Sequence, residues 1–261
     1  MIRSLIALLA LVLCVSCLFL VTNGKAARTT TATKRAPLPQ VDRVLFIGDS
    51  LSVGPFGESI QGQLAQRFGV SNVAAYASCG SSPEHWLQST PVFWTKCGYR
   101  ESTPTRAPVM TQFSNGRPPR PRATPKLETL VRRHRATIVV VQFGTNWMDR
   151  NLTEAQMSSI IDRFVAAARS GPVRQIIWIA PPDHSALSKR QGRIHQLIQQ
   201  GAQRRRFEVI DSRQVTRYVR GQTGGDGIHY NTASSRVWAQ GIRDRLDAKL
   251  SMRSGGAPAR R

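Results

Sequence analysis

The stretch VDRVLFIGDSLSVGPFG, residues 41–57, sets the fold of this chain. It contains a continuous apolar run, Val44 to Ile47, which is typical of a strand buried on both faces of a parallel sheet. Gly48 ends the run, and Ser50 follows in the turn to a helix. In open α/β folds such a turn lies at the carboxyl edge of the sheet, where ligands bind. Ser50 is therefore a candidate nucleophile, although Asp49 and Ser50 are also common helix caps.

Apolar runs alternate with segments of helical periodicity along the rest of the chain. Strands are expected at residues 44–47, 72–77, 137–143, 175–180 and 207–210. Helices are expected at residues 59–68, 126–134, 151–170, 189–206 and 232–250. The alternation predicts an α/β fold, a three-layer α/β/α sandwich with a five-stranded parallel sheet of flavodoxin-like type.

Three further short motifs lie at the ends of the expected strands or helices. Cys79-Gly80-Ser81 comes after the second expected strand, and Gly144-Thr145-Asn146 comes after the third. Asp226-Gly227-Ile228-His229 lies just before the last expected helix. Together with Gly48-Asp49-Ser50-Leu51, these motifs resemble the four blocks of the SGNH (GDSL) hydrolase superfamily, which contains lipase- and acylhydrolase-type serine esterases. The resemblance extends from Val41 to about Leu250, although most of that span agrees only in pattern.

The resemblance assigns roles to five residues. Ser50 would be the nucleophile and His229 its base, while Asp226 lies three residues before His229 and can orient the imidazole. The oxyanion hole would consist of the Ser50 and Gly80 backbone N–H groups and the Asn146 side chain. Such a mechanism needs no metal and no organic cofactor. The family usually has Asp after this Asn, whereas here Trp147 follows. This departure concerns the local hydrogen bonding of the loop and not the donor Asn146 itself.

His184 is the main rival for the base. It follows the fourth expected strand and so also lies at the carboxyl edge of the sheet. Its neighbour Asp183 is poorly placed for a side-chain pair, so we interpret His184 as substrate-facing or part of a plain loop, with no catalytic role. The remaining histidines are interpreted as structural or solvated: His85, His134 and His195.

The chain has 261 residues, 41% of them apolar, which suits one core of ordinary size with extensions. Residues 1–24 are expected to be a signal anchor or signal peptide, because residues 5–21 form an uncharged run. Residues 25–40 are expected to be a flexible linker, residues 41–252 the hydrolase domain and residues 253–261 a disordered tail. The protein is therefore expected to be exported and held at the membrane facing the periplasm or cell exterior, or secreted if the segment is cleaved.

Cys79 and Cys97 are the cysteines outside the apolar run. In an exported domain such a pair favours a disulfide over a metal site or a nucleophile, and it would fix the loop that carries Gly80. If the domain instead faces the cytosol, two buried free thiols are favoured.

The formal net charge is +22, with a basic Pro-rich insertion at about residues 99–125. A charge of this size is typical of proteins that bind an anionic polymer, an anionic membrane surface or nucleic acid. Because the arginines are scattered, a general arginine bias of the source proteome explains the charge equally well. The insertion leaves the loop after the second strand and is expected at the rim of the site. Its arginines are either a means of gathering an anionic substrate or part of a disordered surface loop.

These observations predict an exported serine esterase whose substrate is an O-acyl or O-acetyl group of a cell-envelope carbohydrate. The choice of a carbohydrate as substrate rests on the expected location and on family analogy. An O-acyltransferase that uses the same residues is the first alternative. A non-catalytic binder of anionic polymer is the second, and nucleic acid is not the expected partner.

Overall fold

The computed structural model describes residues 41–88, 91–186 and 188–251. The predictions for residues 1–24, 25–40 and 253–261 therefore lie outside the described residues. Within the described ranges, no helix combines the length and the apolar character that a membrane span requires.

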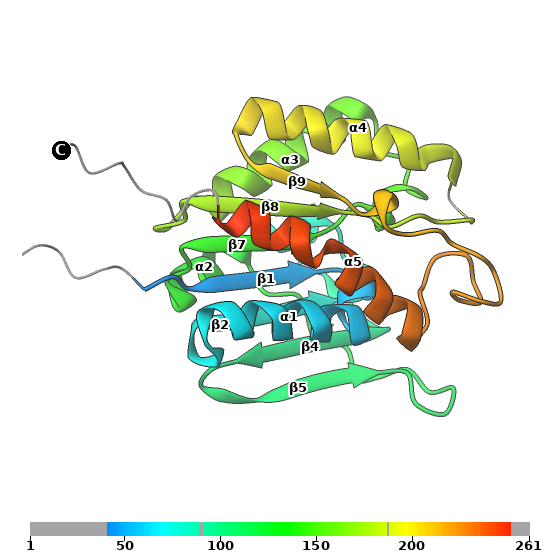
Figure 1. The fold of residues 1–261 in the computed structure, drawn as a ribbon, viewed down its shortest axis with the longest axis horizontal. Coiled ribbons are helices and arrows are strands. Elements are labelled where there is room, and N and C mark those ends of the chain that lie inside the picture. The colour runs from blue at the N-terminus through cyan, green and yellow to red at the C-terminus, as the bar shows by residue number, and fades with distance from the viewer. Residues whose placement is uncertain (1–40, 89–90, 187, 252–261) are drawn as a thin grey trace, which may run out of the picture. The chain divides into compact units, whose positions relative to one another are not determined.

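A seven-stranded sheet forms the centre of the domain, in the order β5-β4-β2-β1-β7-β8-β9 (Figure 1). Five neighbouring strands are parallel: β2 (Val73–Ser78), β1 (Val44–Gly48), β7 (Ile138–Gln142), β8 (Gln175–Ala180) and β9 (Glu208–Asp211). These are the strands expected from the apolar runs, and their order matches the flavodoxin-like arrangement. The predicted α/β class is confirmed.

The prediction of only five strands is wrong. Two antiparallel strands, β4 (Gly98–Thr103) and β5 (Arg106–Gln112), extend the sheet beyond β2. A separate small sheet pairs β3 (Trp94–Thr95) with β6 (Arg122–Ala123). The insertion at residues 99–125 is thus largely ordered, and the disordered-loop alternative is wrong for it. β5 is the edge strand and is mostly exposed, and β4 beside it is only partly buried. Neither strand needs a continuous apolar run, so the apolar pattern did not indicate them.

Helices cover both faces of the sheet. On one face lie α1 (Pro55–Phe68) and α5 (Thr232–Ser251), and on the other lie α2 (Leu127–His134), α3 (Glu154–Ala168) and α4 (Ser188–Arg205) (Figure 1). Side chains of β1 alternate between the two cores: Leu45 and Ile47 join the core under α2, α3 and α4, whereas Val44 and Phe46 pack with α1 and α5. Burial on both faces explains why this strand is apolar throughout.

Strand register brings several loops to one edge of the sheet. Gly48 at the end of β1 pairs with Ala77 of β2 on one side and with Gln142 of β7 on the other. The loops after these three strands are therefore adjacent. β5 also ends at this edge, because its last residue, Gln112, pairs with Gly98 at the start of antiparallel β4.

Candidate active site

Ser50 begins a short 3-10 turn, Ser50–Ser52, directly after β1. The turn folds tightly back on the strand, since a Cβ at Gly48 would lie 2.2 Å from the Ser52 Oγ. That hydroxyl donates a hydrogen bond to the Gln142 Oε1 at 2.8 Å. Gly48 thus provides the space for the turn, and Gln142 ties it to β7.

Asp49 supports the same turn from the buried side. Its Oδ1 accepts the Leu51 N–H at 3.0 Å, and its Oδ2 lies 3.5 Å from the Gln142 Nε2. The carboxyl is fully buried, and this burial raises the pKa of Asp49 to about 7 although the hydrogen bonds act to lower it. Asp49 is therefore a capping residue that does not reach solvent.

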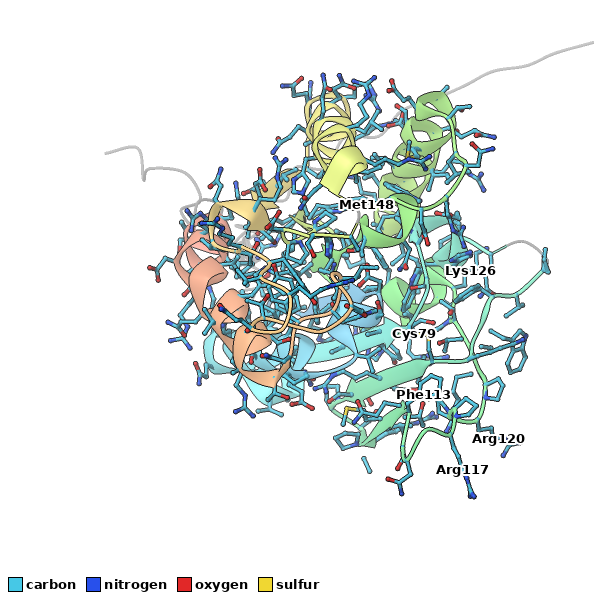
Figure 2. All side chains as sticks on the ribbon, turned by 90° about the vertical axis from the view of Figure 1, so that its right-hand side faces the viewer. Cys79, Phe113, Arg117, Arg120, Lys126 and Met148 are labelled. Carbon is cyan, nitrogen blue, oxygen red and sulfur yellow. A yellow bond between two sulfur atoms is a disulfide. The ribbon has the colours of Figure 1, made fainter. Side chains whose placement is uncertain are left out.

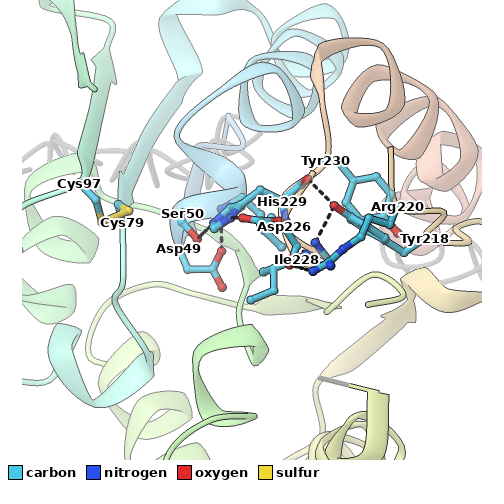
Figure 3. Close-up of polar contacts among 12 residues, drawn as sticks. Asp49, Ser50, Cys79, Cys97, Tyr218, Arg220, Asp226, Ile228, His229 and Tyr230 are labelled. Carbon is cyan, nitrogen blue, oxygen red and sulfur yellow. Dashed lines mark hydrogen bonds and ion pairs between the residues drawn. A yellow bond between two sulfur atoms is a disulfide. The ribbon is translucent and has the colours of Figure 1, made fainter. Parts of the chain in front are cut away.

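Ser50, His229 and Asp226 form a hydrogen-bonded chain (Figure 3). The His229 Nε2 lies 3.1 Å from the Ser50 Oγ, and the His229 Nδ1 lies 2.6 Å from the Asp226 Oδ2. An ionised carboxylate only accepts hydrogen bonds, so the Nδ1 carries the proton in the neutral imidazole. The Nε2 is then free to accept the proton of Ser50.

Asp226 is held as an anion. Its Oδ1 accepts the backbone N–H groups of Ile228 and His229 at 2.8 and 2.7 Å. Partial burial acts to raise the pKa of Asp226, but the hydrogen bonds from the His229 side chain and from these N–H groups outweigh it and lower the pKa to about 2. The side chains of His229 and Asp226 remain 49% and 52% exposed, so the chain of hydrogen bonds is open to solvent.

Tyr218 holds the loop that carries Asp226 and His229. Its hydroxyl accepts the Gly227 N–H at 2.9 Å and donates to the His229 carbonyl at 3.2 Å (Figure 3). The Tyr218 N–H in turn donates to the Asp183 Oδ2 at 2.8 Å. Gly227 has a φ of 88°, which favours glycine, and a Cβ there would lie 2.8 Å from Ala186. No motif or periodicity marks Tyr218 in the sequence.

Gly80 and Asn146 lie in the loops that flank the Ser50 turn. Gly80 has a φ of 76°, and among the described residues no acceptor pairs with its N–H or with that of Ser50. The Asn146 Nδ2 donates to the Ser81 carbonyl at 2.8 Å, which joins the two loops. An amide nitrogen carries two hydrogens, so this bond leaves one for another acceptor. In place of the family's usual Asp, Trp147 is buried, and its Nε1 donates to Glu84 at 3.0 Å.

The predicted disulfide between Cys79 and Cys97 is present, with a Cα–Cα distance of 5.5 Å. It joins the loop of Gly80 to the start of β4 and lies beside Ser50 (Figure 3). A cavity of about 360 Å³ opens between the disulfide and the candidate nucleophile. It is lined by Ser50, Leu51, Val53, Gly54, Pro55, Cys79, Cys97, Gln112, Phe113, His229, Tyr230 and Ser235.

The rival histidine lies apart from this cavity. His184 is only 1% exposed, and its Nε2 lies 3.3 Å from the Thr145 Oγ1. Burial lowers the pKa of His184 to about 4. His195 is also buried and contacts the Pro181 carbonyl at 3.0 Å through its Nε2. Both positions suit structural roles, and the interpretation of His184 as substrate-facing is wrong.

The family comparison identifies an α/β/α enzyme that hydrolyses ester bonds. The sequence profile of the GDSL-like lipase/acylhydrolase family matches residues 44–242, and the chain belongs to this family. It is the SGNH (GDSL) superfamily that the four motifs resemble. A comparison with curated proteins gives no match.

Several solved structures share the fold. TesA superposes with a TM-score of 0.57 at 16% identity, covering 80% of this chain and 100% of that chain. Est24, a carbohydrate acetylesterase from Sinorhizobium meliloti, gives a TM-score of 0.53 at 14% identity over 79% of this chain and 99% of that chain. A peptidoglycan O-acetylesterase gives 0.50 at 14% identity over 82% and 92%. At such identities the likeness extends to the fold and no further.

Proposed function

We propose that this protein is a serine esterase that removes an O-acyl group, such as an O-acetyl group, from a cell-envelope carbohydrate. The observation that carries the proposal is the chain of hydrogen bonds from Asp226 through His229 to Ser50. Because His229 and Asp226 are about half exposed, an ester on a bulky polymer can approach Ser50 from solvent.

The proposed reaction proceeds through an acyl-enzyme. Ser50 attacks the ester carbonyl carbon while its proton passes to the His229 Nε2, and Asp226 stabilises the imidazolium that forms. The Ser50 and Gly80 N–H groups and the Asn146 side chain would donate to the oxyanion. His229 then returns its proton to the departing alcohol. Water, activated by the same imidazole, releases the acid and restores Ser50.

The substrate class that we propose is an acetylated carbohydrate. The cavity beside Ser50 mixes apolar and polar side chains, including Phe113, Gln112 and Tyr230. This mixture suits a short acyl group attached to a hydroxylated ring. Two of the structures that share the fold are acetylesterases of carbohydrate or peptidoglycan, which agrees with this substrate class.

We further propose that the domain is exported and membrane-tethered. The Cys79–Cys97 disulfide supports an oxidising compartment. The tether would be the uncharged run at residues 5–21. Protease digestion of spheroplasts tests this: where the cytoplasmic membrane is the only barrier left, an exported domain is degraded and a cytosolic one is protected.

The esterase activity is tested with the full-length protein on p-nitrophenyl acetate. We expect Ser50→Ala and His229→Ala to lower kcat by about 10,000-fold or more, and Asp226→Ala by a smaller factor. Ser71→Ala is the matched control, since this exposed serine precedes β2 at the opposite edge of the sheet and should not change kcat. Full activity in Ser50→Ala would exclude Ser50 as the nucleophile.

A further inference from the structure

The loop between β5 and β6, residues 113–121, leaves the sheet beside the candidate active site. β5 ends at Gln112, on the same edge as the Ser50 turn. Gln112 and Phe113 line the cavity that also contains Ser50 and His229. The loop is therefore a wall of the site, and a substrate larger than its acyl group would contact it.

This loop is strongly basic. Residues 113–126 contain Arg117, Arg120, Arg122 and Lys126, with no Asp or Glu. Lys126 pairs with Glu128 at 3.2 Å. The exposed guanidinium groups of Arg117 and Arg120, by contrast, have no hydrogen-bond or ion-pair partner within the described part of the chain (Figure 2). Both are available to an anion from solution.

The loop presents these arginines in an ordered way. Ser114 and Arg117 form an antiparallel bridge around Asn115 and Gly116, whose φ values of 50° and 73° are typical of a tight hairpin turn. Prolines at 118, 119 and 121 restrict the backbone that follows. A restricted backbone loses less conformational entropy when it binds a ligand.

A second hollow continues from the first along the loop. It is lined by Gln112, Ser114, Asn115, Arg117, Pro118 and Pro119. Gln112 lines both hollows, so the surface runs from Ser50 past Phe113 to Arg117.

We propose that residues 112–122 form a subsite for the anionic groups of a polysaccharide substrate. The proposal rests on the esterase function proposed above. A guanidinium group binds carboxylate or phosphate oxygens through paired N–H donors, and a neutral sugar offers no such acceptor. With the ester carbonyl at Ser50, neighbouring sugar units would lie along the loop, their carboxylates or phosphates at Arg117, Arg120 and Arg122. The net charge of +22 adds long-range attraction for such a polymer.

Charge substitution tests the subsite better than deletion, because deletion would remove strands of the sheet. The variant combines Arg117→Gln, Arg120→Gln and Arg122→Gln. The matched control removes three exposed arginines from helices α2, α3 and α5, as Arg132→Gln, Arg163→Gln and Arg245→Gln. Acetate release is measured on O-acetylated polygalacturonate and on the same polymer with its carboxylates methyl-esterified.

We expect the loop variant to lower the ratio of kcat/KM, anionic over methyl-esterified polymer, by about 10-fold, since exposed charge pairs each contribute modestly. The change should lie mainly in KM. The control variant should keep the ratio of the wild type. A ratio that stays the same in the loop variant, whether or not both activities fall, would overturn the subsite.

A binding measurement separates the subsite from catalysis. Ser50→Ala protein is titrated with unacetylated polygalacturonate and with poly(glycerol phosphate), and the preferred polymer identifies carboxylate or phosphate as the anion. Binding should weaken as salt rises from about 0.05 to 0.5 M, because exposed charges are screened. Unchanged binding after the loop substitutions, or tighter binding of single-stranded RNA than of either of these polymers, would overturn the inference. Failure to hydrolyse any ester would instead contradict the esterase function, and the titration would still decide the subsite.

Discussion

At the scale of single residues, the site depends on a hydroxyl outside the four motifs. Tyr218 is only 6% exposed, and it bridges the backbone of Gly227 and His229 on the loop that holds the imidazole. It touches neither Ser50 nor the cavity, so its effect on the reaction is through the position of His229. We regard Tyr218 as a positioning residue.

Tyr218→Phe should therefore lower kcat more than it alters KM. The variant leaves the buried Gly227 N–H without its acceptor, which should cost about 1–3 kcal/mol of unfolding free energy. A shift of the imidazole relative to Ser50 should lower kcat by about 10- to 100-fold. Steady-state kinetics and urea denaturation measure the two effects.

Tyr76→Phe is the control for this prediction. Its hydroxyl contacts the His134 Nε2 at 2.9 Å, away from the loop of His229. The control should lose stability without losing kcat. Equal losses of kcat in both variants would contradict a positioning role for Tyr218.

At the scale of elements, the parallel strands were predictable and the antiparallel ones were not. β1 and β7 are buried on both faces, so each is a continuous apolar run in the sequence. β5 is mostly exposed and contains Pro108, which an edge strand tolerates. Nothing in its composition distinguishes it from a loop, and only its pairing with β4 makes it a strand.

The candidate site likewise combines residues that were predictable from the sequence with residues that were not. Ser50, Asp226 and His229 lie in short motifs at the expected strand and helix ends, and the structure brings them within hydrogen-bond distance. Gln112 and Phe113 reach the cavity because the sheet carries β5 to the same edge. Such a contact depends on tertiary topology, which local periodicity does not report. In the sequence, the signal for this contact is a single large apolar residue, Phe113, in the polar segment 111–126.

The disulfide connects the parallel strands to the antiparallel ones. It joins the Gly80 loop after β2 to the start of β4, and so holds the edge hairpin against the Ser50 turn. Replacing Cys79 and Cys97 by Ser should lower the unfolding free energy by about 3 kcal/mol, given the separation of 18 residues. It should also lower kcat, because Gly80 directly follows Cys79.

The reductant provides an internal control for this prediction. Dithiothreitol should lower the stability and kcat of the wild type toward those of the double serine variant. The variant itself should not respond to dithiothreitol. A reduced wild type that keeps its full kcat would show that the hairpin stays in place without the bond.

At the scale of the whole molecule, buried ionisable groups make stability depend on pH in two directions. Burial raises the pKa of Asp49 to about 7, so the folded state binds more protons than the unfolded state between about pH 4 and 7. That group alone makes stability fall as pH rises through this range. His184 and His195 act in the opposite direction, because burial lowers the pKa of each to about 4.

On acidification, the effect of the histidines on stability should exceed that of Asp49. Between about pH 6.5 and 4 the unfolded chain protonates both imidazoles while the folded protein keeps them neutral, so stability falls as pH falls, by up to about 1.4 kcal/mol per pH unit for each. Asp49 offsets one of the two, whereas His85, whose pKa burial also lowers to about 4, adds to the fall. Urea denaturation at about pH 6.5, 5.5 and 4.5 measures the net slope. His195→Gln should reduce by one the number of protons that the unfolded state binds in excess of the folded state. The slope of stability against pH should then be flatter, whatever stability the variant loses at neutral pH. An unchanged slope in His195→Gln would mean that His195 is protonated in the folded protein, as an ion pair with the Asp211 Oδ1 that lies 3.2 Å from its Nδ1.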